Sequence, residues 1–83
     1  MNLENVDLVR TICPLGTEIE IEGVGRLKVQ IPCFNGLLSG IATVLAMLTK
    51  KPVFEGEDFL RSITVLELDT KKKFVKVRIT DSK

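Results

Sequence analysis

The sequence contains no histidine, tryptophan or tyrosine, and only two of its 83 residues are cysteines. Without histidine, the residue most often used for general acid–base catalysis and for metal binding is missing. Two cysteines cannot complete a four-ligand zinc site unless carboxylates help. No catalytic, metal or cofactor motif stands out among the remaining residues, so we expect a protein that is not an enzyme and that uses no cofactor.

The two cysteines, Cys13 and Cys33, allow at most one disulfide, and the sequence does not say whether it forms. Residues 2–10 are polar and acidic, without the basic start and apolar centre of a signal peptide. We therefore expect a cytoplasmic protein whose thiols are reduced and act as small buried hydrophobes. A single glutamine, no tryptophan and many Lys and Glu residues are typical of thermophilic proteins.

The length predicts one domain covering residues 1–83. A chain this short buries only about 60–65% of the surface that it exposes when unfolded, so its stability is marginal. Small domains compensate with disulfides, a metal or oligomerisation. Because the first two are scarce or absent here, oligomerisation is the compensation that we expect.

The net charge of +1 produces no overall field that would attract nucleic acid or an anionic membrane. The charges are nevertheless grouped along the chain. Residues 1–24 and 53–69 are acidic, whereas residues 25–52 and 70–83 are basic. We expect acidic strands to lie beside basic ones, because opposite charges on neighbouring strands stabilise a sheet.

Two segments that alternate strictly, residues 17–22 and 26–31, predict a first β-hairpin. A three-residue loop at residues 23–25 would pair Glu22 with Arg26 and Ile21 with Leu27. One face of the hairpin is then apolar and the other carries opposite charges in register. A slip of one residue would spoil both faces.

A helix is predicted from about Gly36 to Lys50, with Asn35 as its N-cap and Pro52 ending the segment. Its apolar stripe repeats at helical spacing. The stripe consists of Leu37, Leu38, Ile41, Val44, Leu45 and Leu48.

A polar loop follows at residues 52–58, with one helical turn reaching Leu60. A second hairpin is predicted from residues 62–68 and 74–80, with its turn at residues 70–73. The expected cross-strand pairs are Leu68 with Val75, Leu66 with Val77 and Thr64 with Ile79. Residues 7–13 form a further candidate strand, although their alternation is blurred.

The element order (β)ββαββ predicts an α+β fold in which two β-hairpins flank one long helix. One arrangement that fits is an open, β-grasp-like sheet with the helix across one face. The alternative is an OB-like barrel. We favour the open sheet because the helix is long and apolar. Either fold is compatible with many functions.

The side of the helix opposite its apolar stripe is unusual, because no charged residue occurs from Val29 to Thr49. A helix that covers a single sheet normally has a polar outer face. Small residues at spacings of three and four allow close backbone contact, so we predict a homo-oligomer, first of all a two-fold dimer. The predicted interface consists of Gly36, Ser39, Gly40, Thr43 and Met47.

Two other interpretations of this helix are open. Loops of the same chain could cover its outer face. A membrane span is disfavoured, because residues 36–49 extend only about 21 Å at ~1.5 Å per residue, against a hydrocarbon core of about 30 Å. We therefore expect no membrane span.

The C-terminal hairpin carries a basic cluster that is the candidate nucleic-acid site. Clustered cations bind phosphates, and Phe74 could stack on a base. Lysines at hairpin tips are also common simply because they oppose aggregation. The candidate residues are Lys71, Lys72, Lys73, Lys76 and Arg78.

The functional hypothesis is a small, non-enzymatic, homo-oligomeric adaptor or subunit that acts through protein–protein contacts. The alternative is a nucleic-acid-binding module that uses the basic C-terminal hairpin.

Overall fold

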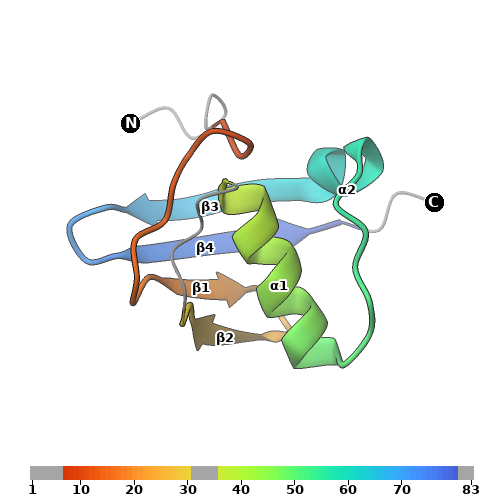
Figure 1. The fold of residues 1–83 in the computed structure, drawn as a ribbon, viewed down its shortest axis with the longest axis horizontal. Coiled ribbons are helices and arrows are strands. Elements are labelled where there is room, and N and C mark those ends of the chain that lie inside the picture. The colour runs from red at the N-terminus through yellow and green to blue at the C-terminus, as the bar shows by residue number, and fades with distance from the viewer. Residues whose placement is uncertain (1–6, 31–35, 81–83) are drawn as a thin grey trace.

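The computed structural model describes residues 7–30 and 36–80, in which a β-hairpin, two helices and a second β-hairpin follow one another (Figure 1). The elements are β1 (Glu18–Ile21), β2 (Gly25–Lys28), α1 (Leu37–Thr49), α2 (Glu57–Ser62), β3 (Ile63–Asp69) and β4 (Phe74–Ile79).

The four strands form one mixed sheet in the order β2-β1-β4-β3. The central strands β1 and β4 are parallel, and each pairs antiparallel with its hairpin partner. Helix α1 lies across one face of the sheet (Figure 1). The predicted α+β open sheet is therefore confirmed. The barrel alternative is wrong, because β2 and β3 are the two edges of the sheet and do not pair with each other.

The first hairpin forms where predicted, but its register differs by two residues. Glu20 lies opposite Arg26 and Ile21 lies opposite Gly25, so the loop is residues 22–24. Gly23 adopts a φ of 78° in this loop, and the Val24 amide donates to the Ile21 carbonyl at 2.9 Å. Because side chains alternate with a period of two, a shift of two residues keeps the apolar and charged faces that the sequence predicted.

The second hairpin has its turn at residues 70–73, as predicted, and Leu68 lies opposite Val75. Beyond that pair the predicted register is wrong, because a β-bulge lies between Val65 and Glu67. Val65, not Leu66, is opposite Val77. The extra residue places Ile63 and Val65, which precede the bulge, on the same face as Leu68, since a bulge shifts the alternation by one.

The core lies between α1 and the covered face of the sheet. The predicted apolar stripe of α1 is confirmed, since all six of its residues belong to this core or pack against it. The most deeply buried large side chains come from α1 and from the two central strands. They are Ile19, Ile21, Leu37, Ile41 and Val77.

Residues 7–13 form a turn, not the predicted strand, apart from one bridge residue at Cys13. The Asp7 carboxylate accepts hydrogen bonds from the Val9 and Arg10 amides at 3.0 and 3.1 Å. The Thr11 amide also donates to the Asp7 carbonyl at 2.9 Å. An aspartate that binds its own following amides stabilises a turn at the expense of an extended strand.

This N-terminal turn meets the start of α1. The Leu38 amide donates to the Leu8 carbonyl at 2.7 Å, which satisfies one of the unpaired amides of the first helical turn. Gly36, not Asn35, occupies the N-cap position, and Asn35 lies outside the described residues. A Cβ atom on Gly36 would lie 2.1 Å from the Val9 carbonyl oxygen.

Helix α1 ends at Thr49, one residue before the predicted end, because Lys50 adopts a left-handed conformation with φ 58°. Helix α2 is longer than the single predicted turn and leads directly into β3. The hydroxyl of Ser62 at its end donates to the Phe59 carbonyl at 2.6 Å.

We predict that Gly36→Ala destabilises the protein by about 2–4 kcal/mol. Its φ of 98° and ψ of 163° belong to a region that only glycine adopts readily, and the added methyl group would collide with the Val9 backbone. Gly23→Ala is the matched control, because Gly23 also has a positive φ but has no neighbour within 4 Å of the added atom. It should cost only about 1–2 kcal/mol.

Urea unfolding followed by circular dichroism measures both variants. If Gly36→Ala unfolds at the same urea concentration as Gly23→Ala, the N-terminal turn does not pack against the start of α1 as described.

Candidate interaction surface

The outer face of α1, where the sequence predicts an interface, is divided into a covered part and an open part. Gly36 and Gly40, near the N-terminal end, are buried, and Ser39 is half-buried. Thr43 and Met47, further along the helix, are exposed, Met47 to 60%. Self-association stays a prediction. Of the five predicted interface residues, Thr43 and Met47 are the two that are exposed and so open to a partner.

The alternative prediction, that loops of the same chain cover the helix, holds at the start of α1. There the backbone of Leu8 and Val9 closes over Gly36. Two or three turns later the helix has no charged side chain, and its hydroxyls are already bonded. Thr43 donates to the Ser39 carbonyl at 2.9 Å, and Thr49 donates to the Leu45 carbonyl at 2.8 Å. Threonines bonded in this way need no further partner, so this surface can be covered by apolar groups at little cost.

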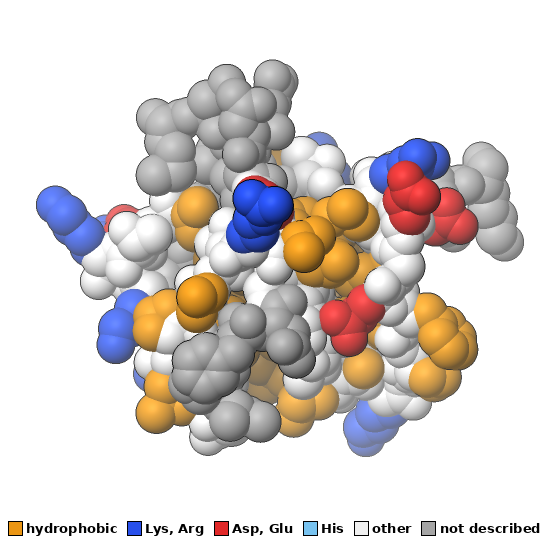
Figure 2. Space-filling model, turned by 45° about the horizontal axis from the view of Figure 1, so that its top comes forward, with side chains coloured by type: hydrophobic (Ala, Val, Ile, Leu, Met, Phe, Trp, Pro, Cys, Tyr) orange, Lys and Arg blue, Asp and Glu red, His pale blue; other side chains and the backbone are white. Residues whose placement is uncertain are grey.

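Several large apolar side chains are exposed on the described part of the chain. Figure 2 shows apolar side chains in several patches across one face of the molecule. Phe54 is the extreme case, with 85% of its surface exposed. The full set is Val9, Ile12, Leu15, Val24, Met47 and Phe54. Scattered apolar residues are normal on protein surfaces, but an almost fully exposed phenylalanine beside an apolar groove indicates a contact site.

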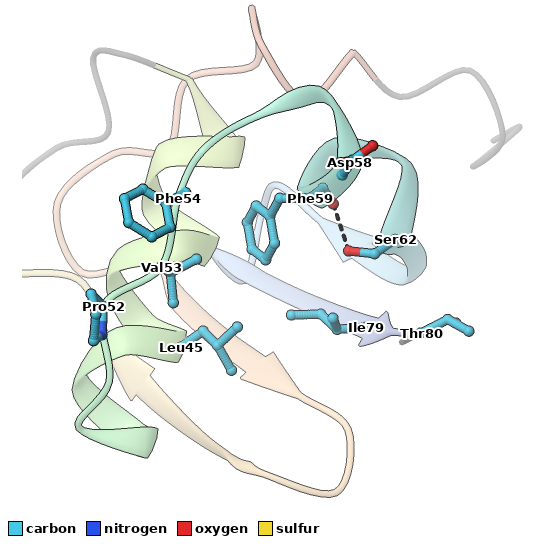
Figure 3. Close-up of a pocket in the computed structure, with 9 residues that line it drawn as sticks. All are labelled: Leu45, Pro52, Val53, Phe54, Asp58, Phe59, Ser62, Ile79 and Thr80. Carbon is cyan, nitrogen blue, oxygen red and sulfur yellow. Dashed lines mark hydrogen bonds between the residues drawn. The ribbon is translucent and has the colours of Figure 1, made fainter. Parts of the chain in front are cut away.

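Phe54 stands at the rim of an open groove of about 430 Å³ between α1, α2 and the end of β4 (Figure 3). The Phe59 ring points toward Ile79 inside the groove, whereas the Phe54 ring lies on the side farther from Ile79. The groove walls are mainly apolar. They consist of Leu45, Pro52, Val53, Phe54, Asp58, Phe59, Ser62, Ile79 and Thr80.

Sequence reasoning missed this groove because residues 52–58 were interpreted as a polar loop. A signal was present in the sequence. Val53 and Phe54 are two adjacent apolar residues between a proline and an acidic segment, outside any strand or helix. Such a pair must either join the core or remain exposed, and here Val53 is half-buried while Phe54 is not.

Charged side chains of opposite sign lie at the two ends of the loop that carries Phe54. Lys50 and Lys51 follow the end of α1, Glu55 lies two residues before α2, and Asp58 lies in the first turn of α2. All four are exposed, and none of them forms an ion pair within residues 7–30 and 36–80. By contrast, the nearby Glu57 is paired with Arg61 at 2.8 Å.

The open face of the sheet is a ladder of opposite charges, as the grouped charges predicted. Strand β1 supplies the acids and lies between two basic strands. Glu20 pairs with Lys76 at 3.7 Å, and Glu22 pairs with Arg78 at 2.8 Å. On the other side, Glu18 lies 3.5 Å from Arg26. Two of the five nucleic-acid candidates, Lys76 and Arg78, are therefore already neutralised by their own chain.

The other three candidates, Lys71, Lys72 and Lys73, form the exposed turn between β3 and β4. The Asp69 carboxylate shapes this turn by accepting the Lys71 and Lys72 amides, both at 3.0 Å. In the described part of the chain, none of these three ammonium groups forms an ion pair. The turn lies at the opposite end of the molecule from α2, which forms one side of the groove (Figure 1).

Cys13 is buried and is joined in a disulfide, so the expectation of a reduced thiol is wrong for this residue. The other cysteine in the sequence, Cys33, lies outside the described residues. A second hollow, of about 210 Å³, lies where the Cys13 loop meets Lys73 and Phe74.

Within residues 7–30 and 36–80, no three His, Cys, Asp or Glu side chains gather in a way that could hold a metal ion. Neither of the helices described has the length and hydropathy to cross a bilayer. No protein-family model, curated protein or solved structure matches this chain.

The pair of Glu22 and Arg78 gives a pH-dependent prediction. The hydrogen bond from Arg78, at 2.8 Å, lowers the pKa of Glu22 below its ordinary value of 4.5. A carboxylate whose pKa is lowered by folding stabilises the folded state above its unfolded pKa, and this contribution is lost as the pH falls through its folded pKa. Stability should therefore decrease as the pH falls below about 4.5.

Urea unfolding at low salt, at pH 7 and at pH 3, measures this effect. Glu22→Gln should make the loss between the two pH values smaller, and Arg78→Gln should do the same because it removes the cause of the shift. The double variant should add nothing to either single variant. An unchanged pH dependence in both single variants would show that the pair does not form.

Proposed function

We propose that this protein is a non-enzymatic subunit that acts through protein–protein contacts, beginning with the formation of a homo-oligomer. The observation that carries the proposal is apolar surface exposed at two places, the open half of α1 and the groove between α1, α2 and the end of β4. Met47 and Phe54, both largely exposed, are the most prominent side chains of this surface. A chain of 83 residues gains stability when a second copy covers such a surface.

The absence of histidine supports the non-enzymatic part of this proposal, because the usual general base is missing from the whole sequence. The charged side chains on the open face of the sheet support it in a second way. Several of them bind each other across strands, as Glu22 and Arg78 do, and so satisfy each other's charge.

A cytoplasmic location is part of the same proposal. A disulfide at Cys13 is unusual in a reducing cytosol, but intracellular proteins of hyperthermophiles are rich in disulfides. The thermophile-like composition of the chain agrees with this setting.

The first test is the oligomeric state, measured by sedimentation equilibrium. We expect a dimer at tens of micromolar. Met47→Lys should shift the equilibrium toward monomer by about tenfold or more, because burying an unpaired ammonium group costs well over 1.4 kcal/mol. Met47 suits this test better than Gly40, since Gly40 is buried and a larger residue there would disturb the fold itself.

Leu15→Lys is the matched control. Leu15 is exposed to 56%, close to the 60% of Met47, but it lies in the N-terminal segment outside α1 and the groove. It should leave the equilibrium unchanged. A wild-type protein that stays monomeric at hundreds of micromolar would contradict the proposal.

The alternative function, nucleic-acid binding, is supported by one observation, the unpaired lysines at the tip of the β3–β4 hairpin. If it is correct, Lys71→Ala with Lys72→Ala should reduce the slope of log K against log salt by about 1.4–1.8, the smaller value applying to single strands. Lys76→Ala with Arg78→Ala should change it less, because both cations are already bound to Glu20 and Glu22. Fluorescence anisotropy with labelled DNA and RNA measures these slopes, and an absence of binding at low salt would exclude the alternative.

A further inference from the structure

The groove is large enough to hold an aromatic ring, and its mainly apolar walls match the polarity of the exposed ring at its rim. The groove offers about 430 Å³ between apolar walls, whereas an apolar cavity of about 150 Å³ is enough to hold a benzene ring. Phe54 supplies such a ring, and 85% of its surface is exposed. A groove large enough for an aromatic ring and an exposed aromatic ring therefore lie side by side on the surface.

This proximity matters for symmetry. In a two-fold dimer the same patch of each copy faces the other. If Phe54 and the groove lie beside the axis, Phe54 of each copy therefore enters the groove of the other, and the contact is made twice. The loop that carries Phe54 runs along one side of the molecule from the end of α1 to α2 (Figure 1). A two-fold axis perpendicular to this loop would place two such loops antiparallel.

The charges along the loop agree with this antiparallel arrangement. Lys50 and Lys51 lie at one end, and Glu55 and Asp58 lie at the other. In an antiparallel pair, the basic end of each copy meets the acidic end of the other. All four side chains lack an ion-pair partner in the described part of their own chain. Complementary charge of this kind favours one orientation and disfavours others.

We infer that the groove between α1, α2 and β4 is occupied by Phe54 of a second copy of this chain, in a two-fold dimer held in register by Lys50 and Lys51 facing Glu55 and Asp58. This inference rests on the proposed function and names the partner and the geometry of its contact.

The expected area is sufficient for a stable dimer only if surface beyond the groove takes part. Each buried phenylalanine contributes about 150–250 Å², so two rings and the groove walls that they cover supply on the order of 600–1,000 Å². Stable interfaces bury about 1,200–2,000 Å² in total. The remainder has to come from further exposed surface, of which Thr43 and Met47 on α1 are the part that the sequence predicted.

Charge reversal tests the orientation. The first variant is Lys50→Glu with Lys51→Glu, and the second is Glu55→Lys with Asp58→Lys. Each alone brings like charges together in its own dimer and should weaken it by about tenfold or more. Mixed in equal amounts, the two variants should form a heterodimer about as tight as the wild-type dimer, because every contact again joins opposite charges.

Sedimentation equilibrium measures the dissociation constants of the wild-type dimer, the two variant homodimers and the heterodimer, and circular dichroism checks that each variant is folded. Weak single variants whose mixture does not associate would overturn the inference. So would single variants that dimerise like the wild type.

Phe54→Ser tests the occupant of the groove. Loss of two central aromatic anchors should raise the dissociation constant by about 100-fold or more. Leu15→Ser is the matched control, because it also removes an exposed apolar side chain, outside the groove, and should leave the constant unchanged. Neither substitution removes a core side chain, so both variants should fold.

The results separate the inference from the proposed function. A wild-type dimer that Phe54→Ser leaves intact would overturn the inference, while the proposed homo-oligomer would stand. A wild-type protein that is monomeric at hundreds of micromolar would overturn both.

Discussion

The packing of one apolar helix on the two central strands determines the rest of this structure. Leu37 and Ile41 of α1 and Ile19 and Val77 of the sheet are the most deeply buried side chains, together with Ile21. Strands β1 and β4 are adjacent and parallel at the centre of the sheet. Each hairpin adds its other strand at an edge, and α1 lies across one face of the four-stranded sheet. The opposite face of the sheet is left to charged side chains, which pair across the strands. Because side chains alternate between the two faces of a strand, the packing of α1 on one face determines which residues are buried and which lie on the charged face.

This constraint explains why the fold could be predicted from the sequence while the registers could not. Hydrophobic alternation determines which face a residue occupies, and the predicted faces of the first hairpin are correct. It does not distinguish registers that differ by two residues. The sequence therefore predicted Leu27 opposite Ile21, whereas the structure has Gly25 there. The bulge beside Leu66 is the second case. The bulge brings Val65 and Leu68 to the same side of the sheet, where both pack against the core. That packing depends on the tertiary structure, so the pattern of β3 alone did not predict the bulge.

The candidate surface was predicted only in part. The uncharged face of α1 was recognised from its composition, but the sequence did not show that the backbone of Leu8 and Val9 covers its first turn. The groove was missed because the segment from Pro52 to Asp58 was interpreted as a polar loop, and because part of its wall, Ile79 and Thr80, lies about 20 residues further along the chain. The nucleic-acid hypothesis changed for a similar reason, since the partners of Lys76 and Arg78 lie on a strand more than 50 residues away.

The central claim is that Phe54 of one copy fills the groove of another, and an isotope-filtered NOE experiment tests it most directly. A sample that mixes ¹³C-labelled and unlabelled chains reports only contacts between copies. The account predicts cross-peaks between the Phe54 ring of one chain and the methyl groups of Leu45 and Ile79 of the other. Spectra of a dimer in which the Phe54 ring contacts no methyl group of the second chain would contradict it.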